Sequence, residues 1–183
     1  MFYLFSALHT LNFLLALGGL VLLVVTIGLY VDYFLYQSRY FIRWFQQYIW
    51  ITIIVTTAGS VALSLLYSEF YGFVPCSLCW LQRIALYPQA LFAIMAFKTK
   101  ESIYFPLYSI ALSIIGLGVA MYHYVYQMIP SDVGTAGILP CLADGSSDCA
   151  TRVIDEFGFV TFPLLSAITF AFLIILYLNL RRS

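Results

Sequence analysis

Two pairs of cysteines are the residues best suited to chemistry in this chain. Cys76 and Cys79 form a C-x-x-C motif, whereas Cys141 and Cys149 enclose a short polar segment. The C-x-x-C spacing is typical of redox dithiols, in which the thiolate is the reactive form. Arg83 follows Cys79 by one helical turn. A thiol pair beside a cation indicates electron transfer more than a structural role.

Two features are expected to lower the pKa of Cys79. If a helix begins near this residue, the helix dipole favours an anion there. Arg83 would then lie on the same helix face, one turn further on. An alternative reading makes Arg83 an interfacial arginine whose side chain reaches toward the lipid headgroups.

The second cysteine pair, Cys141 and Cys149, is better suited to thiol–disulfide exchange than to a structural disulfide. An entropic estimate gives a disulfide across so short a loop only about 2–3 kcal/mol. Cys141 and Cys149 are therefore predicted to form an exposed, exchangeable disulfide, with a structural staple as the alternative. Other pairings of the four cysteines remain open. A zinc site with four thiolates is disfavoured because the spacings match zinc ligands poorly, so no metal is predicted.

The elements that position these cysteines are predicted to be membrane helices. The chain is 63% hydrophobic and 9% charged, whereas soluble domains carry roughly 25% charged residues. A formal net charge of zero offers no field to attract nucleic acid. We expect an all-α integral membrane protein with one bundle and no separate soluble domain. The stretches near the ~20 residues needed to cross a bilayer are Leu11–Val31, Ile49–Tyr67, Leu81–Phe97, Ile103–Tyr122 and Phe159–Leu180.

The third stretch is the least certain span, because it is the shortest and contains Arg83, Pro88 and Gln89. The first is expected to be a retained span rather than a signal peptide, since no Lys or Arg precedes Arg39.

Basic residues are distributed unevenly between the two ends of the predicted spans. By the positive-inside rule, the C-terminus is cytoplasmic and the N-terminus outside. All four cysteines then lie on the outer side, where disulfides persist. The basic residues on the predicted cytoplasmic side are Arg39, Arg43, Lys98, Lys100, Arg181 and Arg182.

His123 lies at the predicted outer end of the fourth span, where the bundle meets the loop. Near a redox centre it could donate a hydrogen bond to a quinone carbonyl or move a proton. The alternative is a packed or interfacial histidine.

Three groups of residues resemble the DsbB/BdbC family of disulfide bond formation proteins. The resemblance runs from about Gln47 to the C-terminus and implies a four-helix transmembrane bundle of the DsbB type in residues 47–183, with an outer redox loop over 124–158. Residues 1–46 would add one N-terminal transmembrane helix and a cytoplasmic loop without a counterpart in that pattern. The matching residues are Pro75–Arg83 with Tyr87 and Pro88, then Tyr122–Tyr124, and then Cys149 with Phe157–Pro163.

The resemblance also implies a function, that of a membrane thiol:quinone oxidoreductase. Such a protein reoxidises a thioredoxin-fold thiol oxidase (DsbA/BdbD-like) outside the cytoplasm and passes electrons to menaquinone or ubiquinone. Cys141 would form the mixed disulfide with the partner, and Cys149 would resolve it. Electrons would then reach the C-x-x-C, in which Cys79 contacts the quinone beside Arg83 and His123. The short loop between Cys141 and Cys149 resembles the Gram-positive-type branch of the family.

Three other functions are considered. A vitamin K epoxide reductase-like enzyme also uses cysteine pairs and a quinone, but its C-x-x-C would follow the loop pair, whereas here it comes first. A membrane scaffold would use both disulfides only to brace outer loops. A metal transporter would need intramembrane acidic or histidine ligands, which the predicted spans lack.

Overall fold

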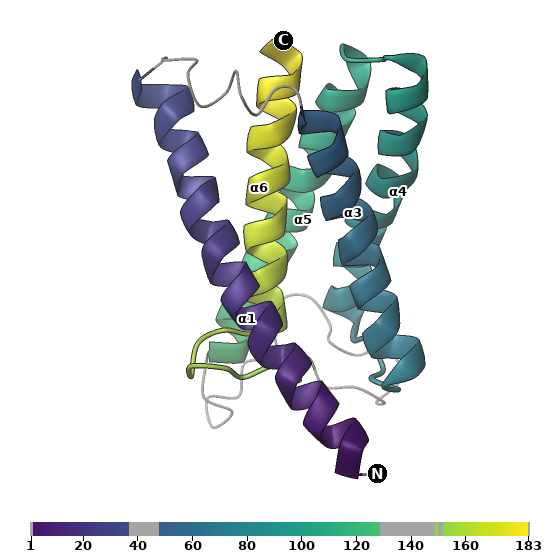
Figure 1. Cartoon of the computed structure of the whole chain (residues 1–183), viewed down its shortest axis with the longest axis vertical. Helices are drawn as coiled ribbons and strands as arrows, with labels where there is room; N and C mark the ends of the chain where they lie inside the picture. The colour runs from purple at the N-terminus through teal and green to yellow at the C-terminus, as the bar shows by residue number, and fades with distance from the viewer. Residues whose placement is uncertain (1, 37–47, 129–148, 150–151, 183) are drawn as a thin grey trace.

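A computed structural model of the protein describes residues 2–36, 48–128, 149 and 152–182, and these residues form five long helices. The predicted all-α fold is confirmed: the described residues contain no strand, only an isolated bridge between Glu156 and Val160. The helices in Figure 1 are α1 (Phe2–Val31), α3 (Ile49–Leu65), α4 (Ser77–Thr99), α5 (Tyr104–Met128) and α6 (Phe162–Arg182). Two short π-helices, η1 (Asp32–Tyr36) and η2 (Leu66–Phe70), continue α1 and α3.

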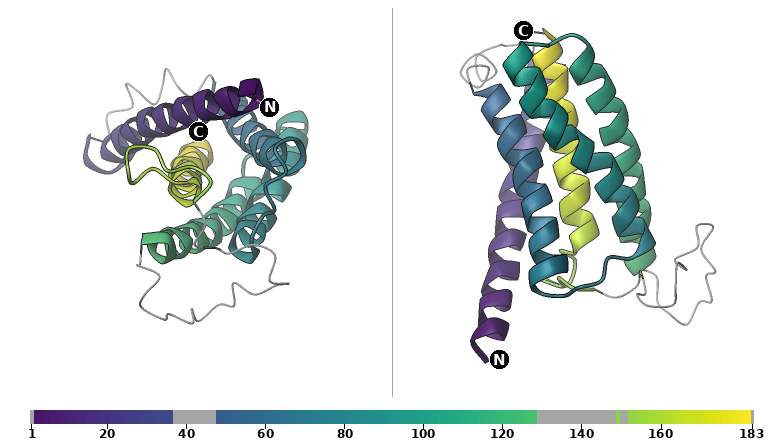
Figure 2. Two further views of the ribbon diagram at one scale, coloured as in Figure 1. Left: turned by 90° about the horizontal axis from the view of Figure 1, so that it is seen from below. Right: turned by 90° about the vertical axis from the view of Figure 1, so that its right-hand side faces the viewer.

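Helix α6 is the central element of the bundle. Seen from below in Figure 2, the other helices surround it. Its buried side chains lie all around the helix, from Pro163 to Leu180, and include Phe170 and Tyr177. A helix that is apolar on every face is stable only when it is enclosed or faces lipid. Helices α1 and α5 both pack directly on α6.

Four of the described helical segments are long and apolar enough to cross a membrane, which makes this a multi-pass membrane protein. These segments are Ala7–Leu35, Ile49–Phe70, Tyr104–Met128 and Phe162–Arg182. Helix α4 is less apolar and is not among them, yet it lies alongside the others in the bundle (Figure 1). Its polar residues Arg83 and Gln89 find hydrogen-bond partners inside the protein, as a membrane environment favours.

The structure corrects three predicted boundaries. Helix α4 begins at Ser77, so Cys79 lies within its first turn instead of at its start. Helix α5 continues to Met128 and places His123 inside the bundle. Residues 159–161 precede α6, because Phe157 and Gly158 make a tight turn at positive φ (57° and 75°). Glycine adopts this backbone conformation without strain.

The two ends of the bundle differ in chemistry. The turn between α4 and α5 lies at the same end as the C-terminus, and this end carries Lys98, Lys100 and the Arg181–Arg182 pair (Figure 1). The opposite end holds the N-terminus and the start of α4, where the C-x-x-C lies. Arg39, Arg43 and Cys141 lie outside the described residues.

A buried glutamine connects three helices in the interior. The Gln89 side-chain carbonyl accepts hydrogen bonds from the Ser113 hydroxyl of α5 (3.1 Å) and the Tyr177 hydroxyl of α6 (2.9 Å). Its amide donates to the carbonyl of Ala85 (2.8 Å). Because Gln89 is fully buried, these bonds satisfy a side chain that would be costly to leave unpaired.

Gly116 allows close packing of α5 on α6, which predicts a matched pair of substitutions. A Cβ atom at Gly116 would lie 2.4 Å from the buried Phe170 ring, whereas one at Gly118 would meet nothing within 4 Å. We expect Gly116→Ala to destabilise the bundle by about 1–3 kcal/mol through overpacking. Gly118→Ala should leave stability unchanged or slightly raised. Thermal unfolding in detergent measures both, and equal midpoints for the two variants would contradict this packing.

Candidate redox site

Cys76 and Cys79 form a reduced dithiol at the first turn of α4. Cys76 caps the helix from an extended conformation (φ −71°, ψ 172°), which Pro75 before it accommodates. Its sulfur accepts a hydrogen bond from the backbone N–H of Cys79 at 3.4 Å. The two sulfurs lie 3.0 Å apart and share a hydrogen bond. Forming a disulfide from this arrangement requires little movement of the backbone.

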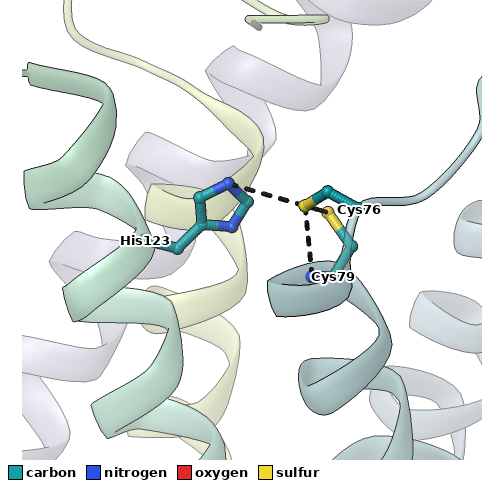
Figure 3. Close-up of side chains that lie close together, drawn as sticks. All are labelled: Cys76, Cys79 and His123. Carbon is teal, nitrogen blue, oxygen red and sulfur yellow. Dashed lines mark hydrogen bonds between the residues drawn. The ribbon is translucent and has the colours of Figure 1, made fainter. Parts of the chain in front are cut away.

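His123 of α5 faces this dithiol from across the bundle (Figure 3). Its Nε2 lies 3.9 Å from the Cys76 sulfur and 3.1 Å from the Cys149 carbonyl oxygen. Its Nδ1 lies 3.2 Å from the Gln82 side-chain nitrogen, one turn into α4. If the Gln82 amide donates to Nδ1, the imidazole proton is on Nε2, where it points at the carbonyl and the sulfur. The buried imidazole therefore connects the two cysteine segments.

Cys149 packs beside the C-x-x-C, although 70 residues separate Cys79 from it in sequence. Its sulfur is disulfide-bonded and lies 3.9 Å from the Ser77 hydroxyl. Its carbonyl also accepts a hydrogen bond from the Gln127 amide at 3.2 Å. Cys141, the predicted partner of Cys149, lies outside the described residues.

The lowered pKa predicted for Cys79 falls instead on Cys76. The hydrogen bond with Cys79 is the largest cause, and together with His123 and the Cys79 backbone N–H it outweighs burial, lowering the pKa of Cys76 to about 4. The prediction for Cys79 was wrong, because the hydrogen bond with Cys76 and burial raise the pKa of the Cys79 thiol. Since α4 begins before Cys79, the backbone N–H of this residue points at the sulfur of Cys76.

Arg83 is held by α3 instead of pairing directly with a sulfur. Its Nε donates to the Ser64 hydroxyl and its Nη2 to the Ser64 carbonyl, both at 2.9 Å. The guanidinium also lies 5.2 Å from the centroid of the Trp80 ring, a cation–π contact. These two hydrogen bonds to Ser64 join α4 to α3, and they keep the Arg83 guanidinium beside the cavity that borders the dithiol.

A cavity of about 730 Å³ opens onto the dithiol. This volume lies within the range of small-molecule sites, about 300–1,000 Å³. At one end its polar lining comprises Cys76, Cys79, Gln82, Arg83, His123 and Gln127. Elsewhere its walls are mainly aliphatic and small residues of α1, α3 and α6.

Three residues of this site, Gln82, Gln127 and Ser64, were not predicted from the sequence. Gln127 follows His123 by one helical turn, so a search for polar residues on the same face would have found it. Gln82 lies within the cysteine motif but had no assigned role. Nothing in the local sequence distinguishes Ser64 from the other serines, because only the packing of α3 on α4 brings it to Arg83.

Among the described residues, Cys76, Cys79 and His123 bring their ligand atoms within 4.8 Å of one another. Two sulfurs and an imidazole are ligand types that zinc accepts, but its structural sites usually have a fourth protein ligand. The site is therefore best described as a dithiol next to a histidine.

A helical membrane protein with a dithiol at the mouth of an apolar cavity is the class defined by this fold and site. Residues 46–180 match the family described as "Disulfide bond formation protein DsbB". The chain belongs to this family, and membership indicates an oxidoreductase role in disulfide formation.

Several curated relatives are similar over most of their length. A probable disulfide formation protein of Oceanobacillus iheyensis is 36% identical over 137 residues, which are 74% of this chain and 87% of the relative. Disulfide bond formation protein C of Bacillus subtilis is 35% identical over 69% of this chain and 84% of the relative. A prophage-derived disulfide bond formation protein B of the same organism is 36% identical over 70% and 82%, respectively. No solved structure matches the chain.

The low pKa of Cys76 predicts a specific pH dependence. A pKa lowered from 9.0 to about 4 leaves Cys76 as a thiolate at neutral pH. We expect the ultraviolet absorbance of this thiolate to persist as the pH falls and to disappear near pH 4. His123→Ala should move the midpoint upward, because a hydrogen bond to the thiolate is lost. Cys76→Ser, as the control, should remove this transition, and a midpoint near 9 in the unsubstituted protein would contradict the assignment.

Proposed function

We propose that the protein oxidises a thioredoxin-fold thiol oxidase outside the cytoplasm and transfers the electrons to a membrane quinone. The observation that carries this proposal is the arrangement of the dithiol: it opens onto an apolar cavity and packs against the Cys149 segment. A dithiol in this position can receive electrons from one side and release them on the other. Family membership supports the disulfide chemistry.

The relay consists of two thiol–disulfide exchanges followed by one oxidation. A partner thiolate attacks the Cys141–Cys149 disulfide at Cys141, and the second partner thiol then closes the partner's disulfide. The loop pair is left as two thiols. When Cys76 and Cys79 have been oxidised to a disulfide by the quinone, Cys149 attacks Cys76, with which it packs, and this breaks the Cys76–Cys79 bond and releases the Cys79 sulfur. Cys141 then attacks Cys149, which restores the loop disulfide and leaves Cys76 and Cys79 reduced.

The residues at the cavity fit a quinone as the electron acceptor. Oxidation of the dithiol would deliver two electrons to a bound quinone. One of the two protons that the quinone needs would come from the Cys79 thiol and the other from the surroundings, because Cys76 is already a thiolate at neutral pH. The Gln82 amide has a second N–H group, beyond the one shared with His123, at the polar end of the cavity, where quinone carbonyls need donors. Arg83 adds a fixed positive charge nearby, which favours negative charge developing on the acceptor. His123 is placed to move a proton, since its Nε2 lies 3.9 Å from the Cys76 sulfur.

The two ends of the bundle support the proposed orientation. Lys98, Lys100 and the C-terminal arginines lie at the end opposite the dithiol. With the basic end in the cytoplasm, the dithiol faces the oxidising side of the membrane. The proposed partner, itself an exported protein, is accessible on that side.

Replacement of Cys79 with serine should abolish quinone reduction by a reduced partner. The C-x-x-C can then no longer form its disulfide, so the final two-electron step is lost. Stopped-flow measurement of quinone absorbance gives the rate. In the same variant, a single exchange between the partner and the loop disulfide should proceed normally, which serves as the control. Full quinone reduction by Cys79→Ser would overturn the proposal.

Replacement of Cys149 with alanine should trap the partner on Cys141. Without Cys149, Cys141 is a free thiol that can attack the disulfide of the oxidised partner and release one partner thiol. No loop thiol can then displace the partner from Cys141, so a covalent adduct should accumulate on non-reducing gels. Cys141→Ala with Cys149 intact is the matched control and should yield much less adduct. A scaffold whose disulfides only brace loops would yield none in either variant.

A further inference from the structure

We propose that α1 forms one wall of the acceptor site and lies along the apolar tail of the bound quinone. This inference rests on the proposed function and extends it to residues outside the matched family region, 46–180. It assigns a role to the additional N-terminal helix, and it defines the acceptor as a quinone with a tail.

Residues of α1 line the cavity over two helical turns. They are Leu14, Leu15, Gly18, Gly19 and Leu22. With a rise of about 1.5 Å per residue, Leu14 and Leu22 lie roughly 12 Å apart along the helix. The other walls come from α3, including Val55 and Gly59, and from α6, including Thr169. Without α1 this side of the cavity would face the lipid directly.

Specific contacts hold α1 against the bundle. A Cβ atom at Gly19 would clash with the end of the Leu165 side chain, so glycine lets α1 approach α6 with this side chain in its present position. At the dithiol end, the buried Asn12 accepts a hydrogen bond from the Tyr67 hydroxyl of η2. Further along, the Tyr30 hydroxyl donates to the Ala171 carbonyl of α6 at 3.1 Å. These contacts fix α1 on both sides of the cavity-lining turns.

The change in polarity along the cavity indicates how its occupant lies. Gln82 and His123 provide hydrogen-bonding groups beside the sulfurs, whereas Leu15, Leu22 and Val55 provide an apolar surface further along. A quinone head fits the polar end, because its carbonyls accept hydrogen bonds and its ring receives the electrons. The apolar length then accommodates a hydrocarbon tail between α1 and α3.

Two glycines of α1 provide a matched test. A Cβ atom at either Gly18 or Gly28 would meet nothing within 4 Å, yet only Gly18 lines the cavity. We expect Gly18→Phe to raise the KM for decylubiquinone by about tenfold or more, because the ring occupies the space of the tail. The KM for menadione, which has no tail, should change little. Gly28→Phe should behave like the unsubstituted protein with both quinones.

A binding measurement separates failure of this inference from failure of the proposed function. Decylubiquinone binding is followed by quenching of tryptophan fluorescence in the Cys79→Ser background, where no turnover is expected, and Gly18→Phe should weaken it. Equal binding with and without Gly18→Phe, or equal effects on both quinones, would overturn the role of α1. If Gly18→Phe weakens decylubiquinone binding but the protein with Cys79 intact does not reduce this quinone, the proposed function is overturned and the role of α1 in binding is supported. Failure to bind or reduce either quinone would overturn both.

Discussion

The attachment of the first turn of α4 to the last turns of α5 is the constraint on which the redox site depends. His123 makes this attachment through Gln82 of α4 and the carbonyl of Cys149. A buried imidazole must satisfy both ring nitrogens, so its position is determined by partners from two other segments. The same ring then lies beside the sulfur of Cys76. Structural pairing and redox chemistry therefore use the same side chain.

The membrane imposes a second constraint, which explains how α4 carries so many polar residues within the bundle. The polar residues of α4 that bond to other helices join it to three neighbours. Arg83 binds Ser64 of α3, and Gln89 binds residues of α5 and α6. In an apolar surrounding an unpaired polar group is expensive, so these bonds favour one arrangement of the helices. Helix α4, which is the least apolar of the five helices, is thus held by polar contacts, and the dithiol lies at its first turn.

The cavity brings side chains from all five helices to one space. Its polar lining comes mainly from the start of α4 and the end of α5, whereas its apolar walls come from α1, α3 and α6. Under the proposed function, an acceptor dissolved in the bilayer would reach the dithiol through this cavity, and a protein thiol would react at the Cys149 segment. Helix α6 lies between α1 and α5, so the lining residues of α1 are on the opposite side of α6 from α5 (Figure 2).

The sequence by itself determined the membrane class, the approximate spans and the cysteines expected to react. Hydrophobic composition and the C-x-x-C motif can be read from the sequence, because they do not depend on how the helices pack. Only the tertiary structure decided which sulfur receives the helix N–H group, because that depends on α4 beginning at Ser77 instead of near Cys79. It also decided that Arg83 faces Ser64 and that α1 lines the cavity. These contacts join residues far apart in the chain, and no local pattern encodes which helix packs against which.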